Sequence, residues 1–161
     1  SMALGADPRS FASTLSRFRG LPHRLEQVRN HRDVIWFDDS KATNFAATLK
    51  SLEGFEDGSV HLILGGRGKG GDPSVLSGMI DRKVKRLYLI GESAAEMRAI
   101  FGSLVETEMA GDLARAVGAA ASRARGGEVV LLSPACASFD QYRDFNERGD
   151  HFQQLARSLD G

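Results

Sequence analysis

The chain has 161 residues, of which 42% are hydrophobic and 26% are charged, the size and composition of a single globular domain. Its 21 basic and 21 acidic side chains balance and no apolar run is long enough to cross a bilayer, so we expect neither nucleic acid nor a membrane as a partner. The one cysteine, Cys136, excludes an internal disulfide and a multi-cysteine zinc site, and it fits a reducing, cytoplasmic compartment.

Predicted helices and strands alternate along the chain. Ser1-Met2 has the form of a cloning scar, so residues 1–7 are predicted to be a tag remnant or linker, and residues 8–161 the domain. A first helix is predicted from Asp7-Pro8 to Gly20, and strands at 25–28 and 34–37 are predicted to form a hairpin. Further strands are predicted at 60–64, 87–90, 104–105 and 129–132, and further helices at 43–52, from 72 through 80, at 93–102 with a Ser93–Glu96 capping box, at 112–126 and at 149–159.

The alternation of apolar strands with helices is typical of an α/β protein. A strand such as Val60-His61-Leu62-Ile63-Leu64 is apolar on both sides, which favours a parallel sheet covered on both faces. The hairpin supplies one antiparallel strand. We therefore expect a Rossmann-like, mostly parallel sheet of about six strands with one antiparallel strand and helices on both faces.

The first of three polar loops, Asp38 to Asn44, lies between a predicted strand and a predicted helix. It brings two carboxylates, an ammonium group and hydroxyls to a helix N-terminus, whose free N–H groups attract anions. Ligands of open α/β sheets lie outside the carboxyl ends of strands, so this loop is a candidate binding site. The same residues also fit a plain helix cap, with Thr43 or Asn44 as the cap and Lys41 in solvent.

The second loop, Gly65 to Asp72, is rich in glycine and carries Arg67 and Lys69. Its glycines allow a tight turn whose N–H groups face an anion, and its two cations add positive charge. It is not a Walker A loop, because the first glycine and the hydroxyl residue of that motif are missing.

Two other interpretations of this second loop remain open. Gly66, Gly68 and Gly71 fit the spelling GxGxxG, and Glu92 lies near the place expected for a ribose-binding acid. A self-contained dinucleotide-binding oxidoreductase domain is therefore an alternative. A flexible surface turn is the other.

The third loop, Ser133 to Asp140, consists mostly of small residues, which let a ligand approach the main chain. Ser138 offers a hydroxyl. Cys136 is interpreted as a small buried thiol rather than a nucleophile, since no histidine lies near it in the sequence. No pair of histidines has the spacing of metal ligands on a helix, so we expect no metal site built by this segment alone.

All three loops follow strands, so we expect them to share one edge of the sheet. That edge would bring together Lys41, Thr43, Lys69 and Ser138. Two cations there would hold a polyanionic or dicarboxylate ligand through charge-assisted hydrogen bonds. The spacing of these residues does not name the ligand.

Strings of residues in these loops resemble the C-terminal domain of the Mur ligase family. The matching strings are Gly20-Leu21-Pro22-His23-Arg24, Asp39-Ser40-Lys41-Ala42-Thr43-Asn44, Leu62-Ile63-Leu64-Gly65-Gly66 with Gly68-Lys69, Ser133-Pro134-Ala135-Cys136-Ala137-Ser138-Phe139-Asp140 and Phe145-Asn146-Glu147-Arg148-Gly149. The resemblance extends from about Pro8 to the end of the chain, and it is closest to the members that add D-glutamate. The chain departs from the family at Asp38, usually Asn, and at Phe139, where Leu is common.

The resemblance implies a cytoplasmic, ATP-dependent ligase of peptidoglycan synthesis, which joins D-glutamate to UDP-N-acetylmuramoyl-L-alanine through an acyl phosphate. It implies that the N-terminal domain and the central ATP-binding domain are absent from this chain. Mg²⁺ would be held mainly by that central domain. We expect the enzyme to be a monomer, and the isolated segment to be inactive.

The resemblance also assigns roles to individual residues. Thr43 and Lys69 would hold the α-carboxylate of D-glutamate, and Ser138, with backbone near Phe145, the γ-carboxylate. The substrate-binding residues it implies are Lys41, Thr43, Lys69, Ser138, Phe139 and Phe145, and those that contact ATP are Arg24 and Asp39. None of them is a nucleophile or a general base, and none is a metal ligand.

Overall fold

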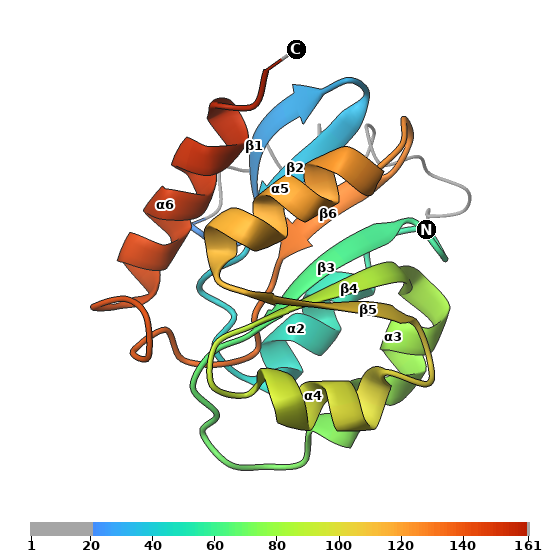
Figure 1. Ribbon diagram of the computed structural model, residues 1–161, viewed down its shortest axis with the longest axis vertical. Coiled ribbons are helices and arrows are strands. Elements are labelled where there is room, and N and C mark those ends of the chain that lie inside the picture. Colours follow the sequence, from blue (N-terminus) through green and yellow to red (C-terminus); the bar gives the residue numbers. More distant parts are fainter. Residues whose placement is uncertain (1–20, 161) are drawn as a thin grey trace.

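The structure, a computed structural model, describes residues 21–160 and shows one mixed sheet between helices (Figure 1). The helix predicted up to Gly20 and the predicted tag remnant lie outside these residues. The sheet has six strands in the order β1-β2-β6-β3-β4-β5. The strands are β1 (Glu26–His31), β2 (Val34–Asp38), β3 (Val60–Gly65), β4 (Val84–Ile90), β5 (Glu106–Gly111) and β6 (Val129–Leu132).

Only one pair of neighbouring strands is antiparallel, namely β1 with β2, and the other neighbouring pairs are parallel. The predicted hairpin is confirmed. Its turn consists of Arg32 and Asp33, whose φ angles of 57° and 67° are both left-handed. Left-handed central residues match the twist of a two-residue hairpin. The predicted fold class is therefore confirmed.

Each central strand contributes to two cores, because successive side chains point to opposite faces. In β3, for example, Leu62 and Leu64 pack in one core and Ile63 in the other, all three fully buried. Phe37 and Trp36 divide in the same way on β2. This alternation with no polar face is why the strands are continuous apolar runs.

Helices cover both faces of the sheet, as predicted (Figure 1). The first face packs against α2 (Phe45–Leu52), η1 (Pro73–Leu76), α3 (Ser77–Lys83) and α4 (Ala94–Phe101), and the second against α5 (Leu113–Arg123) and α6 (Phe145–Arg157). No helix within the described part of the chain is long and apolar enough to span a membrane.

The predicted element boundaries differ most from the structure at β5 and α6. β5 begins at Glu106, beyond the strand predicted at 104–105, because this edge strand is polar and has little apolar signal. α6 begins at Phe145 rather than at Gly149. Its cap explains the difference, since the Asp144 carboxylate accepts from the Glu147 N–H at 2.9 Å.

The predicted capping box of α4 is also wrong. Ser93 makes no side-chain bond to its helix. Its hydroxyl instead accepts a hydrogen bond from the N–H of Gly66 at 3.2 Å, at the end of β3. A contact between neighbouring loops has replaced the local cap.

The sheet order places the polar loops. β2, β6 and β3 are consecutive parallel strands, so the loops that follow them leave the sheet at one edge. These are residues 39–44, 133–144 and 66–72, which we call the β2 loop, the β6 loop and the β3 loop. The predicted shared edge is confirmed.

Candidate ligand-binding site

The three loops are bonded to one another through their backbones. Arg67 of the β3 loop and Ala137 of the β6 loop exchange two hydrogen bonds, at 2.9 and 3.0 Å. The N–H of Ala135 donates to the carbonyl of Ala42, in the β2 loop, at 2.9 Å. The β6 loop therefore connects the other two, as its strand does within the sheet.

A buried arginine reinforces this connection. Arg148 on α6 is 1% exposed and donates to the hydroxyl and the carbonyl of Ser40, at 2.9 and 2.8 Å, and to the carbonyl of Cys136 at 3.1 Å. Burial lowers the pKa of its guanidinium to about 10. Sequence reasoning missed this role, because Ser40 lies 108 positions away and no local pattern connects the two residues.

Two predicted carboxylate-binding residues lie in contact. Lys69 of the β3 loop donates from Nζ to the hydroxyl of Thr43, in the β2 loop, at 3.2 Å. Lys41 lies over the ring of Phe145, with Nζ 4.7 Å from the ring centroid. Within residues 21–160, neither lysine forms an ion pair, so both charges are available to an anion.

Ser138 and Phe139 belong to a turn of the β6 loop. Ser138 is buried, and its carbonyl accepts from the N–H groups of Gln141 and Tyr142 at 3.1 and 2.8 Å. Phe139 is 59% exposed. No contact within the described residues joins Ser138 directly to Lys69, so the structure places both on the same edge without bringing them into contact.

The two residues predicted to contact a nucleotide share a cavity of about 530 Å³ with Lys41. Its lining combines cationic, acidic and apolar side chains. The lining residues are Arg24, Leu25, Asp39, Lys41, Ala42, Ala47, Lys50, Ser51, Glu53 and Gly54. The cavity thus brings Arg24 and Asp39 together, and their contact with a nucleotide stays a prediction.

The carboxylate of Asp39, predicted to contact a ribose, already accepts three hydrogen bonds within the protein. It accepts from the N–H of Leu25 at 3.1 Å and from the hydroxyls of Ser51 and Ser133 at 2.5 and 2.7 Å. Burial raises its pKa to about 6, while the three hydrogen bonds act in the opposite direction. A ligand hydroxyl would have to share this carboxylate with its present donors.

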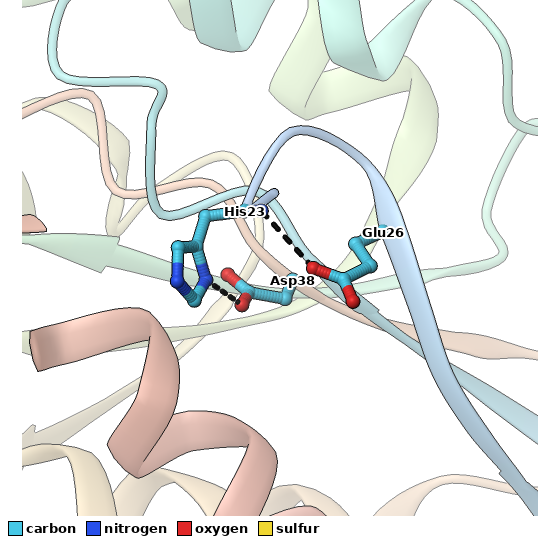
Figure 2. Close-up of side chains that lie close together, drawn as sticks. All are labelled: His23, Glu26 and Asp38. Carbon is cyan, nitrogen blue, oxygen red and sulfur yellow. Dashed lines mark hydrogen bonds and ion pairs between the residues drawn. The ribbon is translucent and has the colours of Figure 1, made fainter. Parts of the chain in front are cut away.

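His23, Glu26 and Asp38 form a cluster next to Arg24 and Asp39 in the chain (Figure 2). The Nδ1 of His23 lies 2.5 Å from Oδ2 of Asp38, and its backbone N–H donates to Glu26 at 3.1 Å. The amide of Gln153 donates to both carboxylates, at 2.7 Å to Asp38 and 3.0 Å to Glu26.

These three residues are spaced closely enough to hold a metal ion, although sequence reasoning found no such group. Oδ2 of Asp38 and Oε1 of Glu26 already accept hydrogen bonds from His23 and Gln153. The cluster is therefore a hydrogen-bonded network that fixes the polypeptide next to Arg24.

Packing explains why two residues of the second loop are glycines. A Cβ at Gly65 would lie 2.1 Å from the carbonyl oxygen of Ile90, and one at Gly66 would lie 2.5 Å from that of Ala137. Both glycines also have left-handed φ angles, 126° and 137°. The predicted ribose acid, Glu92, pairs with Arg67 at 3.0 Å.

Solved structures of ligases share this fold. The chain is similar to UDP-N-acetylmuramate-alanine ligase MurC from Thermotoga maritima, with a TM-score of 0.61 and 14% identity over 97% of this chain and 35% of that one. MurF ligase from the same organism, in complex with ADP, also has a TM-score of 0.61, with 18% identity over 88% and 33% of the two chains. The chain therefore has the fold of a domain found in these ligases.

The chain belongs to the Mur ligase family, since the family model described as "Mur ligase, glutamate ligase domain" matches residues 23–136. UDP-N-acetylmuramoylalanine--D-glutamate ligase from Desulfatibacillum aliphaticivorans is 50% identical over 145 residues, which are 90% of this chain and 32% of that protein. The ligase of the same name from Geotalea uraniireducens is 44% identical over 99% of this chain and 35% of its own length.

The chain spans about a third of the length of the curated relatives it matches. The predicted family resemblance is confirmed. The alternative of a dinucleotide-binding oxidoreductase is not supported by any of these relatives, and the packing of Gly66 explains its glycine without such a cofactor.

Proposed function

We propose that this chain is the C-terminal, amino-acid-binding domain of an ATP-dependent ligase that adds D-glutamate to UDP-N-acetylmuramoyl-L-alanine in peptidoglycan synthesis. Its identity of 50% and 44% to ligases of that name supports the proposal. The N-terminal and central domains of the enzyme lie outside this chain. In this proposal the enzyme is a cytoplasmic monomer that needs neither nucleic acid nor a membrane.

One observation carries the amino-acid site, namely the contact of Lys69 with Thr43 across two loops. An ammonium group and a hydroxyl at 3.2 Å supply two donors to one small anion, and no internal carboxylate within the described residues neutralises Lys69. Charge-assisted bonds of this kind are roughly twice as strong as neutral ones. We assign the α-carboxylate of D-glutamate to this pair.

The γ-carboxylate is assigned to Ser138 and the backbone at Phe145. Phe145 is the first residue of the 13-residue helix α6, so its end carries free N–H groups and a partial positive charge. Lys41 lies over the Phe145 ring and adds a full charge beside it. Phe139, exposed next to Ser138, would cover the carbon chain of the ligand.

The nucleotide is assigned to the cavity that Arg24, Lys41 and Asp39 line. Arg24 forms no ion pair within the part of the chain that the structure describes, so its guanidinium is free to bind phosphate or ribose oxygens. Asp39 would share its carboxylate with a ribose hydroxyl. The small apolar surface of Leu25, Ala42 and Ala47 offers packing to a base.

Magnesium, which accompanies ATP in this proposal, does not suit the lining of that cavity. The carboxylate of Asp39 already accepts three hydrogen bonds, and Glu53 faces Lys50 at 3.8 Å. Magnesium requires near-octahedral oxygen ligands. We therefore assign its ligands to the central domain outside this chain.

In this proposal the domain positions D-glutamate and supplies positive charge to its carboxylates, and none of its residues acts as a general acid or base. In the proposed reaction, ATP phosphorylates the carboxylate of UDP-N-acetylmuramoyl-L-alanine, the amine of D-glutamate attacks the acyl phosphate, and phosphate leaves as the amide bond forms. Lys69, Thr43 and Ser138 would hold D-glutamate at its two ends, so that only its amine can face the acyl group. Such positioning is worth up to about 7–11 kcal/mol of barrier in well-oriented reactions.

Titration of the chain with D-glutamate, followed by amide NMR shifts, tests the amino-acid site. We expect shifts in the β2, β3 and β6 loops for D-glutamate, and their loss in Lys69→Ala. Lys85→Ala is a matched control, because Lys85 is the second residue of β4, at the opposite end of the strands, and pairs with Glu128. Shifts that persist in Lys69→Ala, or that disappear equally in Lys85→Ala, would contradict the assignment.

A further inference from the structure

The turn that carries Arg24 into the cavity is strained. His23 and Leu25, on either side of it, have left-handed φ angles of 65° and 45°. Such a conformation is unfavourable for a non-glycine residue and persists only where the surroundings hold it. Two hydrogen bonds do so, from the N–H of Lys41 to the carbonyl of His23 at 3.0 Å and from the N–H of Leu25 to Asp39 at 3.1 Å.

The ring of His23 adds contacts with two further elements. Its Nδ1 lies 2.5 Å from the buried carboxylate of Asp38, at the end of β2, and its Nε2 lies 3.2 Å from Asp150, on α6. The ring fits against α6 only because residue 149 is glycine, since a Cβ there would lie 2.2 Å from Nδ1. His23 therefore connects the turn to both β2 and α6 (Figure 2).

The surroundings of the ring favour its charged form. Asp38 from β2, Asp150 from α6 and Glu26 from β1 all face it, and only an imidazolium donates from both nitrogens at once. The hydrogen bond to Asp38 raises the pKa of His23, burial opposes this, and the charges of Asp38, Asp150 and Glu26 raise it further.

We propose that His23 is a positioning residue for nucleotide binding, whose ring, bonded between Asp38 and Asp150, holds Arg24 in the lining of the cavity. The inference rests on the proposed role of that cavity. His23 does not itself line the cavity, so it acts through the backbone of the turn. Loss of the ring would leave the strained turn free to relax and would release Arg24.

A double-mutant cycle tests this coupling. ADP affinity of the full chain is measured for the wild type, His23→Gln, Arg24→Ala and the double variant. We expect each single variant to weaken binding by about tenfold and the double variant to be no weaker than Arg24→Ala, because coupled residues are not additive. Independent, multiplicative losses would overturn the proposal.

Asp150, the exposed partner of the His23 ring, offers a milder variant, which keeps the proposal testable if His23→Gln does not fold. Asp150→Asn removes the negative charge that faces Nε2 of the ring, and Asp81→Asn, on the exposed face of α3, is its control. In ¹⁵N NMR titrations we expect the wild-type His23 ring to titrate above its ordinary value, and Asp150→Asn to lower that midpoint. Asp81→Asn is expected to leave the midpoint unchanged.

The same samples separate the two proposals. The ordering of the backbone N–H of Arg24, measured by ¹⁵N relaxation without ligand, is expected to fall in Asp150→Asn and to remain in Asp81→Asn. An unchanged Arg24 ordering in Asp150→Asn and His23→Gln would overturn the positioning role. If Arg24→Ala instead left ADP affinity unaltered, the nucleotide assignment would fail, whatever the relaxation data showed.

Discussion

Among single residues, the buried carboxylate of Asp39 makes the stability of this domain depend on pH. Its pKa is about 6 in the folded protein because burial disfavours the charge. In the unfolded chain an aspartate titrates near its ordinary value, about 3.9. Between these two values the folded state binds more protons, so stability decreases as pH rises from about 4 to about 6 and is level above that.

Replacing Asp39 by asparagine tests this dependence. The wild type is expected to lose up to about 3 kcal/mol of unfolding free energy across that interval through this residue. Asp39→Asn should lose correspondingly less, since its side chain does not titrate. Urea unfolding at pH 4.5 and pH 7 measures the difference, with exposed Asp81→Asn as control. Equal pH dependence in Asp39→Asn and Asp81→Asn would show that another group is responsible.

Residue types and loop positions predicted the exposed residues of the candidate site better than the buried residues that hold the loops in place. Lys69 and Thr43 were predictable because each follows a strand, and the contact between them confirms that the loops share an edge. Arg148 and His23 were not, because their partners Ser40 and Asp38 become neighbours only after folding. The spacing of residues in the sequence does not predict contacts between such distant positions.

At the level of elements, two helical glycines have opposite significance. Gly149 in α6 faces the ring of His23, and an added Cβ would lie 2.2 Å from it. Gly118 in α5 has no heavy atom within 4 Å of a Cβ built there. Helix propensity alone predicts that alanine stabilises both positions by about 0.5–1 kcal/mol.

We therefore expect Gly118→Ala to stabilise the domain by about that amount and Gly149→Ala to destabilise it by about 1–3 kcal/mol, because overpacking outweighs propensity. Thermal unfolding of the two variants beside the wild type measures both signs. A stabilised Gly149→Ala would mean that the His23 ring moves freely, which also weakens the case for its positioning role.

The element predictions succeeded where burial is complete and failed at edges and caps. The apolar run at 60–64 is β3, buried along its whole length. At β5 the polar residues Glu106 and Glu108 gave no strand signal. The start of α6 was predicted too late, although Asp144 with Glu147 three residues later has the spacing of a helix cap.

For the molecule as a whole, the proposal implies that this chain cannot turn over ATP alone. The described residues place cations and a cavity at the loop edge, while the magnesium ligands are assigned elsewhere. We expect no release of phosphate from ATP above a buffer blank, with or without D-glutamate. Robust hydrolysis by the purified chain would show that it contains a complete phosphate site and would contradict the domain assignment.

The overall class of the fold followed from the alternation of strands and helices, whereas the order of strands did not. Local patterns show which segments are strands but not which segments become neighbours. The position of β6 between β2 and β3 depends on tertiary packing, and it determines which loops lie next to one another.

The central position of β6 has a consequence for synthesis on the ribosome. Until residues 129–132 emerge, β2 and β3 have no common neighbour, so the nascent chain holds two separate groups of strands with open edges. Open edges of apolar strands pair readily with other chains. Translation that stops before this strand would yield a product prone to aggregate, and the complete polypeptide gains its sheet and its loop edge in the same late event.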